Sequence, residues 1–134
     1  MNRGIIMSYY YSRIVDDSFD HSIERVTNAL QERKFGILTE IDVKETLKKK
    51  LDVDFRNYKI LGACNPPFAH KALQTEDKVG TMLPCNVIVQ ETADGKTEIA
   101  AIDPVESMKA IDNPGLKKIA EEVREMLKES IEKA

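Results

Sequence analysis

The sequence has no tryptophan, only two cysteines, and no apolar run long enough to cross a membrane. Two cysteines cannot form a structural zinc site without other ligands, and in a cytoplasmic chain they are expected to stay reduced unless they do redox work. The only apolar run near the N-terminus, residues 5–7, is far too short for a secretory signal or a membrane span. These absences predict a cytoplasmic protein that does not associate with membranes.

The chain also lacks a surplus of charge of either sign. Its 134 residues carry 20 basic and 23 acidic side chains, which are interspersed and give a net charge of −3. No long-range field is therefore expected to attract nucleic acid or anionic lipid. A chain of this length, 42% hydrophobic, suits one core better than two. We expect a single domain over residues 1–134, with residues 1–7 as a candidate N-terminal extension because Met7 offers a second start.

Hydrophobic spacing and turn residues divide the chain into segments that resemble strands and helices. Strand-like composition marks residues 5–15, 35–43 and 55–64, and Asp94-Gly95 predicts a tight turn between two more strands within residues 83–103. Helical spacing or capping signals mark residues 17–33, 42–51, 65–73, 103–107 and 113–131.

This alternation of strands and helices, followed by a hairpin and a helical tail, predicts the fold class. We expect an α/β domain like an α+β two-layer sandwich, with a mixed sheet of about five strands, helices packed on one face and a C-terminal helix. Apolar residues fall on both strand parities, as at Ile60-Leu61 and Val87-Ile88, so the other sheet face also needs cover. A symmetric homodimer through the sheet is one economical solution.

Two Cys-Asn pairs, Cys64-Asn65 and Cys85-Asn86, raise the question of a reactive site. Strand alternation points both thiols toward apolar neighbours, which favours inert, buried cysteines. Cys64, however, precedes the N-cap of a helix, where free N–H groups and the helix dipole would stabilise a thiolate. The same position also suits a hydrophobic staple onto Ala69. If the two strands are antiparallel, both thiols lie at one edge of the sheet, whereas parallel strands would separate them.

Three hypotheses about function remain open at this point. The first is a pocket for a small ligand formed by Cys64, Asn65, His70, Cys85 and Asn86, or for copper(I) or zinc held by Cys64, Cys85 and His70. The second is a thiol enzyme or redox switch in which Cys64 is the nucleophile, His70 the base and Cys85 the resolving thiol. The third is a structural or interaction module with core cysteines. The sequence has no P-loop, dinucleotide fingerprint or serine elbow, so no cofactor is assigned.

Four stretches, "FGILTEIDVKETL", "YKILGACNPPFAHKAL", "GTMLPCNVIV" and "AIDPVESM", resemble the small bacterial and archaeal family known as domain of unknown function 302. The resemblance runs from about residue 8 to residue 131. It implies a compact single α/β domain that tends to form homodimers, without an established activity. One departure is Lys34, where the family pattern suggests a glycine at the end of a helix. A left-handed lysine there would cost about 1 kcal/mol.

Overall fold

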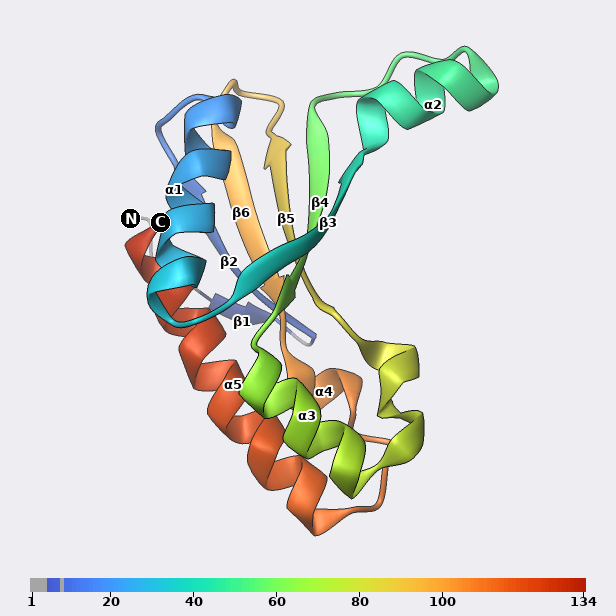
Figure 1. The fold of residues 1–134 in the computed structure, drawn as a ribbon. Helices are drawn as coiled ribbons and strands as arrows, with labels where there is room; N and C mark the ends of the chain where they lie inside the picture. The colour runs from blue at the N-terminus through green and yellow to red at the C-terminus, as the bar shows by residue number, and fades with distance from the viewer. Residues whose placement is uncertain (1–4, 8) are drawn as a thin grey trace.

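The fold is a single antiparallel sheet with helices on one side and beyond both of its ends (Figure 1). The computed structural model describes residues 5–7, as backbone only, and residues 9–134. In chain order the elements are β1 (Ile5–Met7), β2 (Tyr10–Val15), α1 (Phe19–Glu32), β3 (Gly36–Asp42), α2 (Val43–Leu51), β4 (Tyr58–Cys64), α3 (Pro66–Thr75), the short 3₁₀ helix η1 (Asp77–Met82), β5 (Cys85–Glu91), β6 (Thr97–Ile102), α4 (Pro104–Ser107) and α5 (Pro114–Lys133).

The sheet confirms the predicted fold class but not the predicted mixture of strand directions. Among the described residues it has six strands in the order β1-β2-β6-β5-β4-β3, and every neighbouring pair is antiparallel. The predicted first strand is two strands, β1 and β2, which pair with each other. Between β4 and β5 the chain forms α3 and η1 beyond the end of the sheet and returns at that same end, so the two strands run in opposite directions (Figure 1).

The main core lies between the sheet and the helices α1 and α5 (Figure 1). The helical stripes expected from the sequence face inward here, and Val26, Leu30, Leu127 and Ile131 are almost completely buried. The sheet contributes the alternate residues that point toward these helices, which are Tyr11, Val15, Leu61, Ala63, Cys85, Val87, Val89, Ile99 and Ala101. Removing this apolar surface from water is the main favourable contribution to folding.

A second, smaller core lies beyond the end of the sheet, among α3, η1, α4 and the first turns of α5. Its buried residues are Ala72, Val79, Met108, Leu116 and Ala120. The long helix α5 is shared, because its N-terminal half packs in this cluster and its C-terminal half packs on the sheet. The two apolar clusters therefore meet where β4 and β5 border α3.

No helix in the described part of the chain lies on the opposite face of the sheet. The strand register aligns Ile41, Ile60, Ile88, Ala100 and Ser12 in one row across five strands on this face. Ile41 is 46% exposed, whereas Ala100 is shielded by its neighbours on the sheet. The expectation that helices cover one face only is therefore confirmed, and an apolar row remains open to solvent.

The end of α1 has the backbone conformation suspected from the sequence. Lys34 has a φ of 69°, in the left-handed region. Its N–H donates to the carbonyl of Gln31, and the N–H of Phe35 donates to the carbonyl of Leu30, the two hydrogen bonds of a Schellman motif. The motif turns Phe35 into the main core, where it is 2% exposed.

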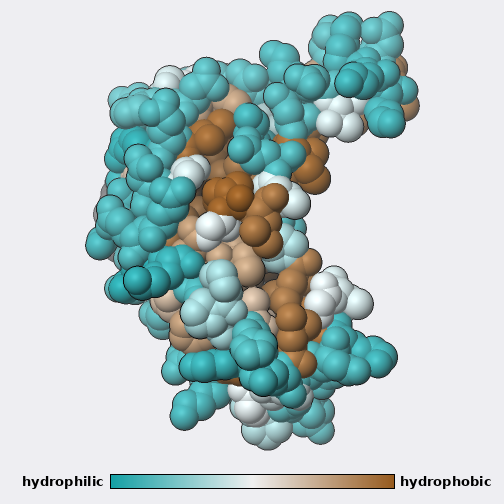
Figure 2. All heavy atoms as spheres, viewed as in Figure 1, coloured by the Kyte–Doolittle hydropathy of each residue, from teal (hydrophilic) through white to brown (hydrophobic). Residues whose placement is uncertain are grey.

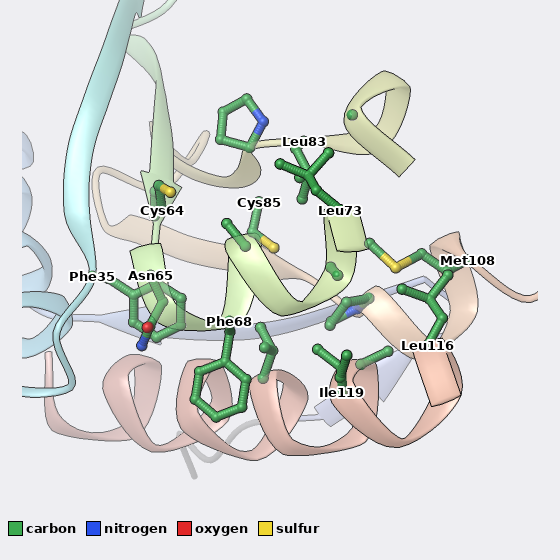
Figure 3. A pocket seen from close by; sticks show the side chains of 18 of the residues that line it. Phe35, Cys64, Asn65, Phe68, Leu73, Leu83, Cys85, Met108, Leu116 and Ile119 are labelled. Atoms are coloured by element: carbon green, nitrogen blue, oxygen red, sulfur yellow. The ribbon is translucent and has the colours of Figure 1, made fainter. Parts of the chain in front are cut away.

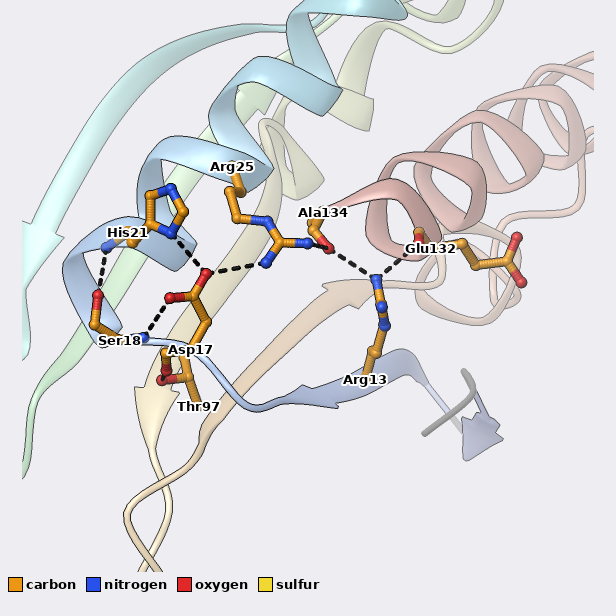
Figure 4. A network of polar contacts seen from close by, with 8 residues as sticks. All are labelled: Arg13, Asp17, Ser18, His21, Arg25, Thr97, Glu132 and Ala134. Atoms are coloured by element: carbon orange, nitrogen blue, oxygen red, sulfur yellow. Dashed lines mark hydrogen bonds and ion pairs between the residues drawn. The ribbon is translucent and has the colours of Figure 1, made fainter. Parts of the chain in front are cut away.

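A polar network fixes the start of α1 against the end of α5 (Figure 4). Ser18 caps α1 by accepting a hydrogen bond from the N–H of His21, and Asp17 accepts from both His21 and Arg25. The hydrogen bond from Arg25 is the main reason that the pKa of Asp17 is lowered. Arg25 also donates to the main-chain oxygen of Ala134, at 2.9 Å. This network lies on the far side of the fold from α3.

Candidate functional site

A cavity lies where the two apolar clusters meet, between the lower ends of β4 and β5 and the helices α3, α4 and α5 (Figure 3). Its volume is about 340 Å³. Figure 2 shows apolar side chains gathered in the middle of the molecule near α3, bordered by hydrophilic surface. The cavity exists because α3 packs beyond the sheet end against α5, rather than on the sheet, so side chains from the two clusters do not fill the space between them.

The wall of the cavity is almost entirely apolar. Phe35 and Ala63 contribute from the main core, and Met108 lies at the far end in Figure 3. Leu38 and Leu73, which are 66% and 42% exposed, border its opening to solvent. The remaining lining residues are Cys64, Asn65, Phe68, Ala69, Ala72, Gly80, Leu83, Pro84, Cys85, Pro104, Leu116, Ile119, Ala120 and Val123.

Both thiols line this cavity. Because β4 and β5 are antiparallel, Ala63 pairs with Cys85 and places the two cysteines at the same end of the sheet. Cys64 is half-buried, whereas Cys85 is 8% exposed. Burial, with a smaller contribution from Cys64, raises the pKa of Cys85 to about 11. Cys85 is therefore an uncharged thiol at neutral pH.

Asn65 also lines the cavity, but it does not cap α3 with its side chain as the sequence suggested. It occupies the N-cap position and is 6% exposed, and its Nδ2 donates to the carbonyl of Arg33 at 3.0 Å. This hydrogen bond ties the start of α3 to the loop that follows α1. Asn65 therefore holds one wall of the cavity in place.

The N-terminus of α3 is poor in hydrogen-bond donors. Pro66 and Pro67 occupy its first two positions, and neither has an N–H group. The third residue, Phe68, is left as the donor of the first turn, because the N–H of Ala69 already donates to the carbonyl of Asn65. A helix start of this composition is a weak site for an anion, so stabilisation of a thiolate by free N–H groups has little support.

The remaining predicted site residues lie elsewhere. His70 is exposed on α3 and does not line the cavity. Asn86 is exposed on the uncovered sheet face, where it borders a shallow hollow with Tyr10 and Tyr58. In residues 5–7 and 9–134, no three His, Cys, Asp or Glu side chains are grouped closely enough to hold a metal ion. The structure thus joins Cys64, Asn65 and Cys85 but leaves His70 and Asn86 outside.

Several cavity residues were missed by reasoning from the sequence. The helix expected over residues 113–131 contains Leu116, Ile119, Ala120 and Val123, and only the position of α3 makes these residues part of a cavity wall. Leu38 points to the opening because the register of β3 against β4 shifts between residues 37 and 39. A bulge of this kind leaves one residue without a partner. No local signal in the sequence announces it.

Comparison with known proteins identifies the family. The sequence profile described as "Domain of unknown function DUF302" matches residues 11–134. The chain belongs to the DUF302 family. A crystal structure of an uncharacterised conserved DUF302 protein from Bacillus stearothermophilus superposes with a TM-score of 0.89 at 30% sequence identity, covering 95% of this chain and 98% of that one. No curated protein matches the chain.

Membership of DUF302 confirms the resemblance seen in the sequence and the α/β fold, and it brings no activity with it. Among the residues that the structure describes, no helix of this DUF302 protein combines the length and apolar character needed to span a lipid bilayer.

Proposed function

We propose that this protein binds a small, largely apolar molecule in the cavity between β4, β5, α3 and α5. The observation that carries the proposal is the cavity itself, about 340 Å³ with an almost wholly apolar wall. Pockets of this size and character are typical of small-molecule sites. The cavity opens to solvent beside Leu38 and Leu73, so a ligand has a route of entry.

The character of the wall selects the class of ligand. Asn65 is uncharged and already donates one Nδ2 hydrogen to the carbonyl of Arg33, and Cys85 stays an uncharged thiol at neutral pH, so neither neutralises a charged ligand group. A ligand that buries a charge here would lose its hydration without compensation. We therefore expect uncharged or weakly polar organic molecules to bind and small hydrophilic anions to be excluded.

Titration with N-phenyl-1-naphthylamine, an uncharged dye that fluoresces in apolar surroundings, tests the proposal. We expect saturable binding at one site per chain. The Ala69→Leu variant adds three carbons to a residue that lines the cavity and should weaken binding at least tenfold. The matched control is His70→Leu, one position further on the same helix but outside the cavity, which should bind like the wild type.

Equal dye binding by the wild type and Ala69→Leu, with both variants unfolding at the temperature of the wild type, would place the dye elsewhere and remove the support for a ligand site here.

We also propose a homodimer through the uncovered sheet face. The row formed by Ile41, Ile60 and Ile88, next to the buried Ala100, leaves apolar area in water. Glu98 is an acidic residue on this face that already accepts a hydrogen bond from Gln90. Five strands spaced by about 4.8 Å, with six residues each at about 3.3 Å, present roughly 500 Å² of flat area. Two such faces bury about 1,000 Å², the lower end for a specific interface.

Sedimentation equilibrium measures this association directly. The Ile88→Arg variant places a charge at the centre of the row and should be monomeric at concentrations where the wild type dimerises. Ala110→Arg adds the same charge at an exposed loop position and should leave the dimer intact. A wild-type protein that stays monomeric at 100 times the concentration used to compare the variants would refute the interface.

A reducing compartment such as the cytoplasm is our proposal for its location, because both cysteines are free and Cys64 is partly accessible. Alkylation of intact cells before lysis measures the state of these thiols. Recovery of the protein with oxidised cysteines would contradict the proposal.

A further inference from the structure

Cys64 is a nucleophilic side chain that lines the cavity and is also partly exposed to solvent. It is the last residue of β4, where the chain leaves the sheet for α3, and it is half-buried. Its side chain lies at one side of the cavity in Figure 3, near that of Cys85. Cys85 is more than nine-tenths buried in the same wall and makes no side-chain hydrogen bond. A molecule in the cavity would therefore lie against an accessible thiol and a protected one.

We propose that the cavity presents Cys64 to apolar α,β-unsaturated carbonyl compounds, which become covalently attached to its sulfur. The proposal rests on the proposed binding of apolar molecules and deepens it, because it names the chemical class of the ligand and the atom that captures it.

The reaction is a conjugate addition that needs no oxidant, reductant or other co-reactant. The sulfur of Cys64 forms a bond to the β-carbon, the electron pair of the carbon–carbon double bond moves to the α-carbon, and the proton lost by the thiol ends on that α-carbon through water. The product is a thioether that contains every atom of both reactants.

Selectivity in this site comes from proximity. An apolar tail that lies along Phe68, Ala69 and Ala72 on α3 holds the unsaturated end close to the strand ends, which raises its effective concentration at Cys64. Small hydrophilic electrophiles do not bind to an apolar wall, so their rate of reaction with Cys64 is not increased. His70 is exposed and does not line the cavity, so the proton is transferred to water rather than to this imidazole.

The competing thiol in the same wall is suppressed. Cys85 is buried, and its raised pKa leaves very little thiolate at neutral pH, which is the form that attacks electrophiles. Adducts are therefore expected on Cys64, with Cys85 unmodified in the folded protein.

Alkylation kinetics with two maleimides, which are α,β-unsaturated carbonyl compounds, test the proposal. N-methylmaleimide and N-octylmaleimide share a reactive ring and differ in the apolar tail. Rates are measured at neutral pH by intact-protein mass spectrometry, and peptide mapping identifies the modified cysteine. The same two reagents are reacted with glutathione, which has no cavity, to give the octyl-to-methyl rate ratio expected without binding. We expect the octyl-to-methyl ratio for Cys64 to exceed that of glutathione at least tenfold, and the octyl rate to saturate with reagent concentration.

Variants separate the cavity from general reactivity. Ala69→Leu should reduce the octyl-to-methyl ratio to that of glutathione. His70→Leu should retain the full ratio, and Cys64→Ser should abolish rapid labelling. N-phenyl-1-naphthylamine should slow the octyl reagent but not the methyl reagent.

The outcomes also separate this inference from the proposed function. If the dye binds the wild type and the maleimide ratio equals that of glutathione, or if Cys85 reacts as fast as Cys64, the capture proposal is overturned while apolar binding stands. If neither the dye binds nor the ratio rises, both proposals are wrong.

Discussion

Replacement of Lys34 by glycine should stabilise the protein. Lys34 has a φ of 69° at the end of α1, where the Cβ atom of an L-residue crowds the following carbonyl oxygen. The left-handed conformation costs a non-glycine residue roughly 1 to 2 kcal/mol. Glycine avoids this cost but loses about 0.5 to 1 kcal/mol through its freer unfolded chain. The difference between these two ranges spans about 0 to 1.5 kcal/mol, and we expect a gain near its middle, about 0.5 to 1 kcal/mol, for Lys34→Gly.

Other contributions of Lys34 do not offset this gain. Its side chain is exposed and forms no ion pair within the described part of the chain. The two hydrogen bonds of the Schellman motif involve main-chain atoms, so they survive the substitution. For a domain of this size, the gain corresponds to a rise in melting temperature of roughly 2 to 5 °C.

The assay is urea unfolding followed by circular dichroism, with a thermal scan as a second measure. Lys34→Ala is the matched control, because it removes the same charged side chain but keeps the Cβ atom that causes the strain. We expect the glycine variant to be the more stable of the two by at least 0.5 kcal/mol. Equal midpoints for the two variants, with equal slopes, would refute the argument from backbone strain.

Three further predictions follow from buried positions. Gly62→Ala should destabilise by about 1 to 3 kcal/mol in urea unfolding, because the new Cβ would overlap Thr39 Oγ1 and lie 2.8 Å from Pro84 Cγ. A smaller loss in a Thr39→Ala background confirms the clash, and an equal loss contradicts it. Burial raises the pKa of Cys85 from 9.0 to about 11, so the folded protein keeps this proton at a pH where the unfolded chain loses it. The resulting contribution to the free energy of unfolding is fully present below about pH 9 and is lost as pH rises to 11, about 2 to 3 kcal/mol in all. Cys85→Ala should therefore reduce the loss of stability between pH 9 and pH 11. An unchanged loss in this variant would mean that other groups cause it. Asp103→Asn should cost roughly 1 to 3 kcal/mol, since Arg124, 3.2 Å away, would lose its buried partner. That cost should shrink in an Arg124→Met background, where an undiminished loss would exclude the pairing.

Much of the local structure was predictable because it depends on residues that are close in the sequence. The apolar stripes of α1 and α5 consist of residues three and four apart in the sequence, and most of these residues are buried as expected, whereas Phe19, Ile23 and Ile119 are partly buried. Asp94-Gly95 specified the β5–β6 hairpin, with Gly95 at a φ of 83°. Caps at Asp42 and Asn113 also formed as their side chains indicated.

Predictions about strand direction and the site needed information that the local pattern does not contain. Cys64 and His70 are six residues apart, yet the turn of α3 puts one at the cavity and the other in solvent. Asn86 follows Cys85 directly, and strand alternation sends it to the opposite face of the sheet.

The amino-acid sequence by itself determined the helices, the hairpin, the left-handed end of α1 and membership of the DUF302 family, because each depends on short-range spacing or on matching motifs. Only the tertiary structure decided that all the strand pairs are antiparallel and that a cavity lies between two apolar clusters. Its wall joins Phe35, Cys85 and Val123, which are far apart in the chain. An unfilled volume of this kind depends on how whole elements pack against one another, and the spacing of residues along a single element does not record it.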